Sequence, residues 1–213
     1  MSLAALREKV SEHFLADFGT LAAHPRDGIG EGTLVLLGPA EPGFWPHVTA
    51  QPEFIDGRPD PLDRWSRRVI HALALAVNGT AYYPFGEPLR PFFSWAIESG
   101  RAWRSPVQLL VHDRAGLMVS YRGAVLLPEA HDPRSGRKSP CTSCMDKPCL
   151  TACPAQALTG DGYDLAACHA YLDTDAGSTN LLRGCAVRRA CPVSENYGRL
   201  EEQSAFHMKQ FHK

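Results

Sequence analysis

Seven cysteines are the residues of this chain whose type and spacing could do chemistry, and all of them fall between Cys141 and Cys191. The chain has 213 residues, and its first 140 contain no cysteine. Disulfides are rare in reducing compartments, where clustered thiols more often bind metal. The odd number of cysteines also favours metal binding over complete disulfide pairing.

The cysteines form two groups that each end in a Cys-Pro pair. The first is Cys141-x2-Cys144-x4-Cys149-x3-Cys153-Pro154, and the second is Cys168 followed by Cys185-x5-Cys191-Pro192. Bacterial ferredoxins carry C-x2-C-x2-C-x3-C-P, in which three thiolates hold one [4Fe–4S] cluster and the fourth holds the other. Three close thiolates can wrap three corners of a cube, and a distant thiolate completes it. The spacing therefore predicts a [4Fe–4S] site.

A zinc site is the alternative, because a C-x2-C pair and two further cysteines can close a tetrahedron around one ion. Zinc would use four of the seven thiols and leave three unexplained. The pairs Cys153-Pro154 and Cys191-Pro192 also fit the crossed connectivity of ferredoxins better. Iron–sulfur binding is the favoured interpretation.

The runs CTSCMDKPCLTACPAQAL, YDLAACHAYL and GCAVRRACPVS resemble the iron–sulfur segment of epoxyqueuosine reductases and, more distantly, of reductive dehalogenases. Those proteins hold two [4Fe–4S] clusters on eight cysteines. The chain departs from them by two extra residues between Cys144 and Cys149. The resemblance implies one complete cluster site, made by Cys141, Cys144, Cys149 and Cys191.

The resemblance also implies a second site that lacks its fourth thiolate, made by Cys153, Cys168 and Cys185. Arg188 stands three residues after Cys185, where that family has a cysteine. Three outcomes are open: a three-cysteine cluster, recruitment of another ligand such as His169, or loss of the site. Arg188 favours loss, because a guanidinium offsets the charge of thiolates but cannot bind iron.

The elements that must position these residues are predicted from hydrophobic periodicity. An apolar stripe predicts a helix over residues 3–21, and a second stripe predicts one over 60–77, starting at Asp60-Pro61 and ending at Asn78-Gly79. A short helix is expected over 91–99 and a final one over 200–211. Residues 33–37 read as a buried strand, and 39–61 read as a long surface loop rich in Pro and Gly.

Two further β segments precede the cysteines. Residues 80–85 are a predicted strand, and the runs 107–111 and 117–127, joined by residues 112–116, predict a β-hairpin. This mixed order of helices and strands predicts an α+β fold. A polar stretch over 131–140 separates a body, residues 1–130, from a cysteine module, residues 141–213.

The segments GTLVLLGP, DPLDRWSRRVIHALALAV, NGTAYYPF and VHDRAGLMVSYRGAVLLPE resemble the CblC-type cobalamin-processing family. The resemblance implies a nitroreductase-like antiparallel sheet with helices, joined here to a small C-terminal ferredoxin-like module. It also implies that cobalamin could bind the body. The candidate pocket residues are Tyr82, Tyr83, Phe85, Tyr121, Arg122 and Gly123; the alternative is that they are core residues.

Composition excludes other classes of function. The formal charge of −1 gives no basic surface for nucleic acid, and no apolar run is long enough to span a membrane. Charged residues near the N-terminus argue against a signal peptide, so a cytoplasmic location is expected. The oligomeric state is not predicted.

We expect an iron–sulfur redox protein that passes single electrons through a [4Fe–4S] cluster to a partner protein or a bound cofactor. A cobalamin-dependent reductase or B12-processing enzyme is the second hypothesis, and a zinc-stabilised binding module the third. Whether the chain is an enzyme stays open; if so, it is an oxidoreductase of the cobalamin and iron–sulfur type.

Overall fold

The computed structural model describes residues 3–130 and 136–213, which form two compact units. The first unit comprises the described residues of Met1–Arg101 and Ser120–Gly136, and the second those of Ala102–Val119 and Arg137–Lys213. The segment 102–119, expected in the body, therefore belongs with the cysteines. Part of the expected linker, residues 131–135, lies outside the described residues.

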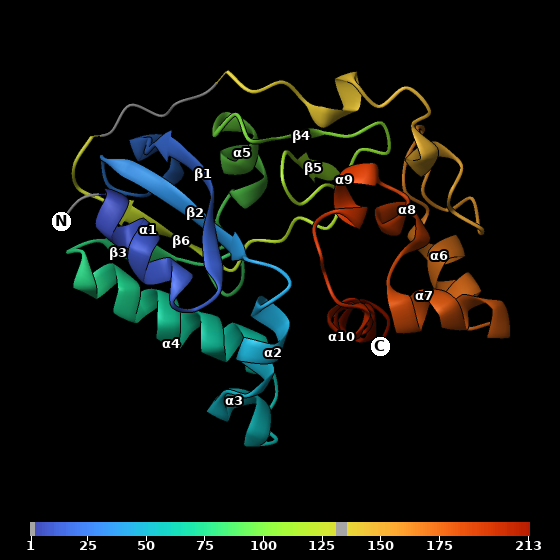
Figure 1. Cartoon of the computed structure of the whole chain (residues 1–213), viewed down its shortest axis with the longest axis horizontal. Helices are drawn as coiled ribbons and strands as arrows, with labels where there is room; N and C mark the ends of the chain where they lie inside the picture. Colours follow the sequence, from blue (N-terminus) through green and yellow to red (C-terminus); the bar gives the residue numbers. More distant parts are fainter. Residues whose placement is uncertain (1–2, 131–135) are drawn as a thin grey trace. The chain divides into compact units, whose positions relative to one another are not determined.

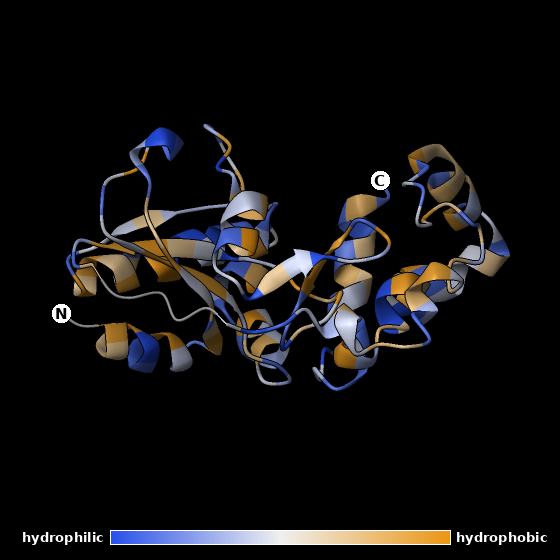
Figure 2. Ribbon diagram, turned by 90° about the horizontal axis from the view of Figure 1, so that it is seen from above, coloured by the Kyte–Doolittle hydropathy of each residue, from blue (hydrophilic) through white to orange (hydrophobic). Residues whose placement is uncertain are grey.

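The first unit is built on a four-stranded antiparallel sheet (Figure 1). Its strand order is β1 (Leu15–Ala22), β2 (Thr33–Pro39), β6 (Gly123–Leu127) and β3 (Thr80–Tyr82). Every residue of the two central strands, β2 and β6, is buried, which explains their uninterrupted apolar sequences. Apolar colours dominate these strands in Figure 2. The expectation of an α+β fold is confirmed, and so is the strand predicted over 33–37.

The helices of the first unit are α1 (Leu3–Ser11), α2 (Phe44–Thr49), α3 (Pro52–Ile55), α4 (Pro61–Ala76) and α5 (Phe92–Glu98), with the 3₁₀ turn η1 (Pro25–Asp27). Helix α4 contacts β3 and β6, and Trp65, Val69 and Leu73 are among the residues that it buries. It starts at Pro61, and Asn78 turns left-handed at φ 54° after its end. The helices predicted over 60–77 and 91–99 are confirmed.

The helix predicted over residues 3–21 is correct only in its first half. Helix α1 ends at Ser11, Phe14 has a left-handed φ of 52°, and the chain continues as β1. The register between β1 and β2 shifts between Asp17 and Gly19, so a β-bulge resets the alternation. A bulged strand can bury residues at irregular spacing. Here the apolar residues Phe14, Phe18 and Leu21 are spaced as they would be along one face of a helix.

Two other predictions for the first unit need correction. Residues 39–61 are not a plain surface loop, because α2 and α3 lie within them and α2 buries Phe44, Trp45 and Val48. The strand predicted over 80–85 extends only over Thr80–Tyr82.

The predicted hairpin is wrong, although its turn exists. His112 and Gly116 exchange backbone hydrogen bonds, and the His112 Nδ1 accepts from the amides of Arg114 and Ala115. Strand β5 (Leu110–His112), however, pairs with β4 (Ala102–Arg104) in the second unit, whereas β6 belongs to the first unit. After the turn, the Leu117 amide donates to Ser194 Oγ over 2.9 Å instead of to a strand.

The second unit combines the two-stranded sheet β4–β5 with short helices. They are η2 (Pro140–Thr142), η3 (Pro148–Leu150), α6 (Leu165–Leu172), η4 (Asp175–Gly177), α7 (Ser178–Arg183), α8 (Ala186–Arg189), α9 (Pro192–Glu195) and α10 (Glu201–Phe211). The helix predicted over 200–211 is thereby confirmed. The core of this unit packs Val107, Val111 and Leu117 against Val187, Leu158 and two of the thiols. Among the described residues, no helix is long and apolar enough to cross a membrane.

Candidate metal centre

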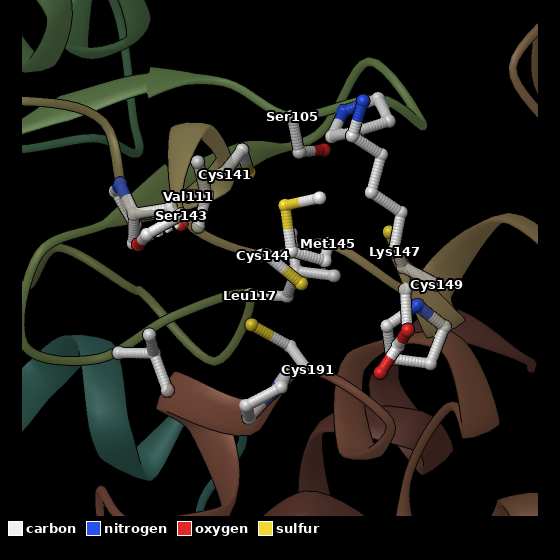
Figure 3. Close-up of a pocket in the computed structure, with 16 residues that line it drawn as sticks. Ser105, Val111, Leu117, Cys141, Ser143, Cys144, Met145, Lys147, Cys149 and Cys191 are labelled. Atoms are coloured by element: carbon white, nitrogen blue, oxygen red, sulfur yellow. Dashed lines mark hydrogen bonds between the residues drawn. The ribbon is translucent and has the colours of Figure 1, made fainter.

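Four thiols line one cavity of about 520 Å³ in the second unit. They are Cys141 on η2, Cys144 in the following turn, Cys149 on η3 and Cys191 directly before α9. Figure 3 shows Cys144 and Cys191 pointing toward each other, with Cys141 and Cys149 at other sides of the cavity. Cys149 and Cys191 are buried, while Cys141 and Cys144 are partly exposed. The structure thus brings together the four cysteines predicted to form the complete site.

Local signals in the sequence shape the loop that carries three of these thiols. Ser139 caps η2, since its Oγ accepts from the Cys141 amide over 3.3 Å. Pro140 and Pro148 stand at the first positions of η2 and η3, where a missing amide is tolerated. Lys147 takes a left-handed φ of 41° just before Pro148.

The four thiols influence one another electrostatically. Burial raises the pKa of Cys141, and the neighbouring thiols Cys191 and Cys144 raise it further. The pKa of Cys149 is also raised, first by burial and then by the charges of Cys141, Cys191 and Cys144. Burial and mutual repulsion thus disfavour the ionised form of Cys141 and Cys149, and a bound cation would favour it.

The other three cysteines form a second group in the same unit. Burial raises the pKa of Cys168, and the nearby Cys185 and Cys153 raise it further. Cys168 lies on α6 and Cys185 directly precedes α8. Tyr163 Oη donates to Cys168 Sγ over 3.4 Å. Of the described residues near these three cysteines, Tyr163 is the one that the structure places in direct hydrogen-bonding contact with a thiol, that of Cys168.

Arg188 and His169 were the two residues considered for the incomplete site. The Arg188 Nη1 donates to the Leu117 carbonyl over 2.5 Å, and its charge also acts on Tyr163. The His169 Nδ1 lies 2.7 Å from His212 Nδ1, and its ring stacks on Phe211 with centroids 4.7 Å apart. His169 therefore contacts the C-terminal helix and the residue after it.

Some contributors to the site were missed in the sequence. The segment 102–119 supplies Ser105, Pro106, Val111 and Leu117 to the cavity wall. Its local sequence pattern instead predicts part of a hairpin in the body. Tyr163 was also missed, although an aromatic residue five positions before Cys168 is a signal that could have drawn attention to it.

The aromatic residues proposed to line a cofactor pocket make internal contacts in the first unit. Tyr82 lies under Arg90, whose guanidinium carbon is 5.2 Å from the ring centre. Arg67 lies 5.3 Å from the ring centre of Tyr83 and 5.1 Å from that of Phe85. Burial raises the pKa of Tyr83, and Arg67 opposes this shift. The aromatic rings thus pack around arginines.

The remaining pocket candidates lie where β6 begins. Tyr121 is buried, with its ring near those of Phe18 and Phe92. The Arg122 Nη1 lies 3.4 Å from Asp63 Oδ1, and burial lowers the pKa of Arg122. A Cβ at Gly123 would lie 2.7 Å from Ile70 Cδ1 and 2.9 Å from the Tyr82 carbonyl oxygen. Close packing accounts for a glycine at this position, and the cobalamin pocket stays a prediction.

Among residues 3–130 and 136–213, no group of three or more His, Cys, Asp or Glu side chains is arranged to hold a single metal ion. A [4Fe–4S] cluster makes a different demand, because each thiolate binds its own iron atom at a separate corner. The cavity lined by four thiols fits that demand in its donor set. Comparison with protein-family models, curated proteins and solved structures finds no match for the chain.

Proposed function

We propose that the chain is an iron–sulfur redox protein that passes single electrons to a partner protein or a bound cofactor. The observation that carries the proposal is the cavity of about 520 Å³ lined by Cys141, Cys144, Cys149 and Cys191. When bound there, a [4Fe–4S] cluster supplies one-electron exchange.

The residues around the cavity set the conditions for that exchange. Val111, Leu117 and Val193 give it an apolar wall, which keeps water from part of the site. Lys147 is a cation in the lining and favours the more negative, reduced state of a cluster. Met145 is 87% exposed and lines the same cavity, so the loop that carries Cys144 reaches solvent. A partner could approach the cluster at this loop.

The finer assignment of the fold belongs to the same proposal. The four-stranded antiparallel sheet with its helices is compatible with a nitroreductase-like, CblC-like first unit. The second unit, with its paired Cys-Pro motifs, would be ferredoxin-like. In this proposal the first unit is where an acceptor cofactor such as cobalamin would bind, and a cytoplasmic location suits unpaired thiols.

The test is to purify the full chain without oxygen and to measure iron, acid-labile sulfide and zinc. A single complete cluster gives about four irons and about four sulfides per chain, and a visible absorbance that bleaches on reduction. We expect Cys191→Ser to abolish this cluster. Ser143→Ala, which changes a hydroxyl in the lining of the same cavity, is the matched control and should retain it. Zinc without sulfide would contradict the proposal.

A further inference from the structure

We propose that Ser105 is a positioning residue of the four-thiol cavity, and that its hydroxyl donates a hydrogen bond to a sulfur atom of the cluster held by Cys141, Cys144, Cys149 and Cys191. This inference rests on the proposed iron–sulfur function and names a residue that tunes it. Ser105 does not bind iron in this assignment. Its hydroxyl acts on sulfur, either a sulfide of the cluster or a ligand thiolate.

Ser105 combines burial with an unused hydrogen-bond donor. It lies in the wall of the cavity, where Figure 3 draws it together with the four thiols, and only 4% of its surface is exposed. Its Oγ is buried, and no hydrogen-bond partner for this atom lies within residues 3–130 and 136–213. A buried hydroxyl without a partner is costly, because it has given up its hydrogen bonds to water. An acceptor inside the cavity would remove that cost.

The backbone of Ser105 is held by hydrogen bonds of its own. Ser105 lies in the loop between β4 and β5, where its amide donates to the Leu109 carbonyl over 2.8 Å and its carbonyl accepts from the Gln108 amide over 2.9 Å. Val107, in the same loop, is fully buried in the core of the second unit. The loop is thereby fixed, and the hydroxyl is the part of Ser105 that is left to contact a group in the cavity.

Two other donors of the cavity wall already have partners. The Ser143 Oγ donates to the Pro140 carbonyl over 3.2 Å, and the Leu117 amide donates to Ser194 Oγ over 2.9 Å. Ser143 is also exposed, so water can satisfy its hydroxyl. Ser105 and Ser143 therefore place chemically identical groups on the wall of one cavity, but only the hydroxyl of Ser105 is both buried and unpartnered within the described chain.

A hydroxyl that donates to cluster sulfur favours the reduced state. Reduction adds negative charge, which is shared by the sulfur atoms, so these atoms accept a stronger hydrogen bond in the reduced cluster than in the oxidised one. Val111 and Leu117 make the wall apolar near Ser105, so little water competes for this contact. Ser105 therefore raises the reduction potential of the cluster and leaves its four ligands unchanged.

The first test is a potentiometric titration of the full chain purified without oxygen. At a fixed potential, the ratio of reduced to oxidised cluster should fall about tenfold in Ser105→Ala, which is about 59 mV for one electron. Ser105→Thr keeps the hydroxyl and should keep the ratio. Ser143→Ala, which removes a hydroxyl that already has a partner on the protein, is the matched control and should leave the ratio unchanged. Equal ratios in Ser105→Ala and Ser143→Ala would overturn the inference, and loss of iron from Ser105→Ala would show a role in ligation instead.

The second test detects the hydrogen bond itself by electron–nuclear double resonance of the reduced cluster. The unaltered chain and Ser143→Ala should show a strongly coupled proton that exchanges in heavy water, and Ser105→Ala should lack it. A proton that persists in Ser105→Ala would assign the contact to water or another donor and would overturn the inference. About four irons per chain, with a potential and a proton signal that do not depend on Ser105, would sink this inference and leave the proposed function standing. Absence of iron and sulfide would remove both.

Discussion

Gly116 shows how a single residue attaches the segment 102–119 to the rest of the second unit. Its φ is +56°, and a Cβ added there would lie 2.5 Å from the Ser194 amide nitrogen and 2.6 Å from Ser194 Oγ. The next residue, Leu117, donates its amide to that same Ser194 Oγ. Only a residue without a side chain permits this close approach, and the approach brings Leu117 to the cavity wall.

We therefore expect Gly116→Ala to destabilise the protein more than a change at another left-handed glycine. Gly57 is the matched control, because its φ is +68° and nothing lies within 4 Å of an added Cβ. Gly57→Ala should lower the free energy of unfolding by about 1–2 kcal/mol, from backbone strain alone. Gly116→Ala should lose about 1–3 kcal/mol more, from the added clash. Denaturant unfolding measures both, and equal losses would contradict the packing described here.

At the scale of elements, two histidines connect α2 to the end of α1. The rings of His13 and His47 have centroids 6.1 Å apart. Burial lowers the pKa of both from the ordinary value of 6.5, and Arg68 lowers both further. His13 also lowers that of His47, whereas Glu12 acts in the opposite direction on His13. The folded protein thus holds both rings in the neutral state more strongly than the unfolded chain does.

These shifts predict how stability depends on pH. Near and below pH 6.5 the unfolded chain binds more protons at these histidines than the folded protein does, so protonation favours unfolding. The free energy of unfolding should fall as pH is lowered from about 7 through the lowered pKa values. His47→Gln should flatten this dependence. Urea unfolding at a series of pH values measures this, and identical slopes in the variant and the unaltered protein would refute it.

A comparison of α4 with β1 shows which local signals were sufficient to predict an element from the sequence. Helix α4 was predicted because its first-turn proline and its buried stripe both lie within its own residues. Strand β1 was missed because its conformation depends on a bulge, which Asp17 stabilises by accepting from the Gly19 amide over 2.9 Å. Arg7, on α1, also donates to the Asp17 carboxylate. A bulge supported by a distant arginine leaves no periodic pattern.

At the scale of the whole molecule, the last turn of α10 supports the surroundings of Cys168 from a distant part of the sequence. The Phe211 ring stacks on Tyr163 and on His169, and His212 Nε2 lies 3.0 Å from Asp173 Oδ1. The C-terminal helix therefore holds the hydroxyl that contacts Cys168, although Phe211 is 48 residues from Tyr163.

We expect Phe211→Ala to weaken the attachment of the last turn of α10 to Tyr163 and His169. Loss of these ring contacts should lower the free energy of unfolding by about 1–2 kcal/mol. Lys209→Ala, at an exposed position of the same helix, is the control and should change this free energy by less than about 0.5 kcal/mol. Denaturant unfolding measures both variants, and equal losses would contradict the packing role of Phe211.

The sequence by itself determined the chemistry that is available: seven thiols between residues 141 and 191, and local helices such as α4 whose signals lie within a few turns of chain. Tertiary structure alone decided which segment forms the wall of the four-thiol cavity. Leu117 reaches that wall through Ser194 and Arg188, which lie 77 and 71 residues away in sequence. Buried backbone amides and carbonyls must form hydrogen bonds. When their partners are side chains far away in the sequence, neither hydrophobic periodicity nor cysteine spacing predicts which partners they are.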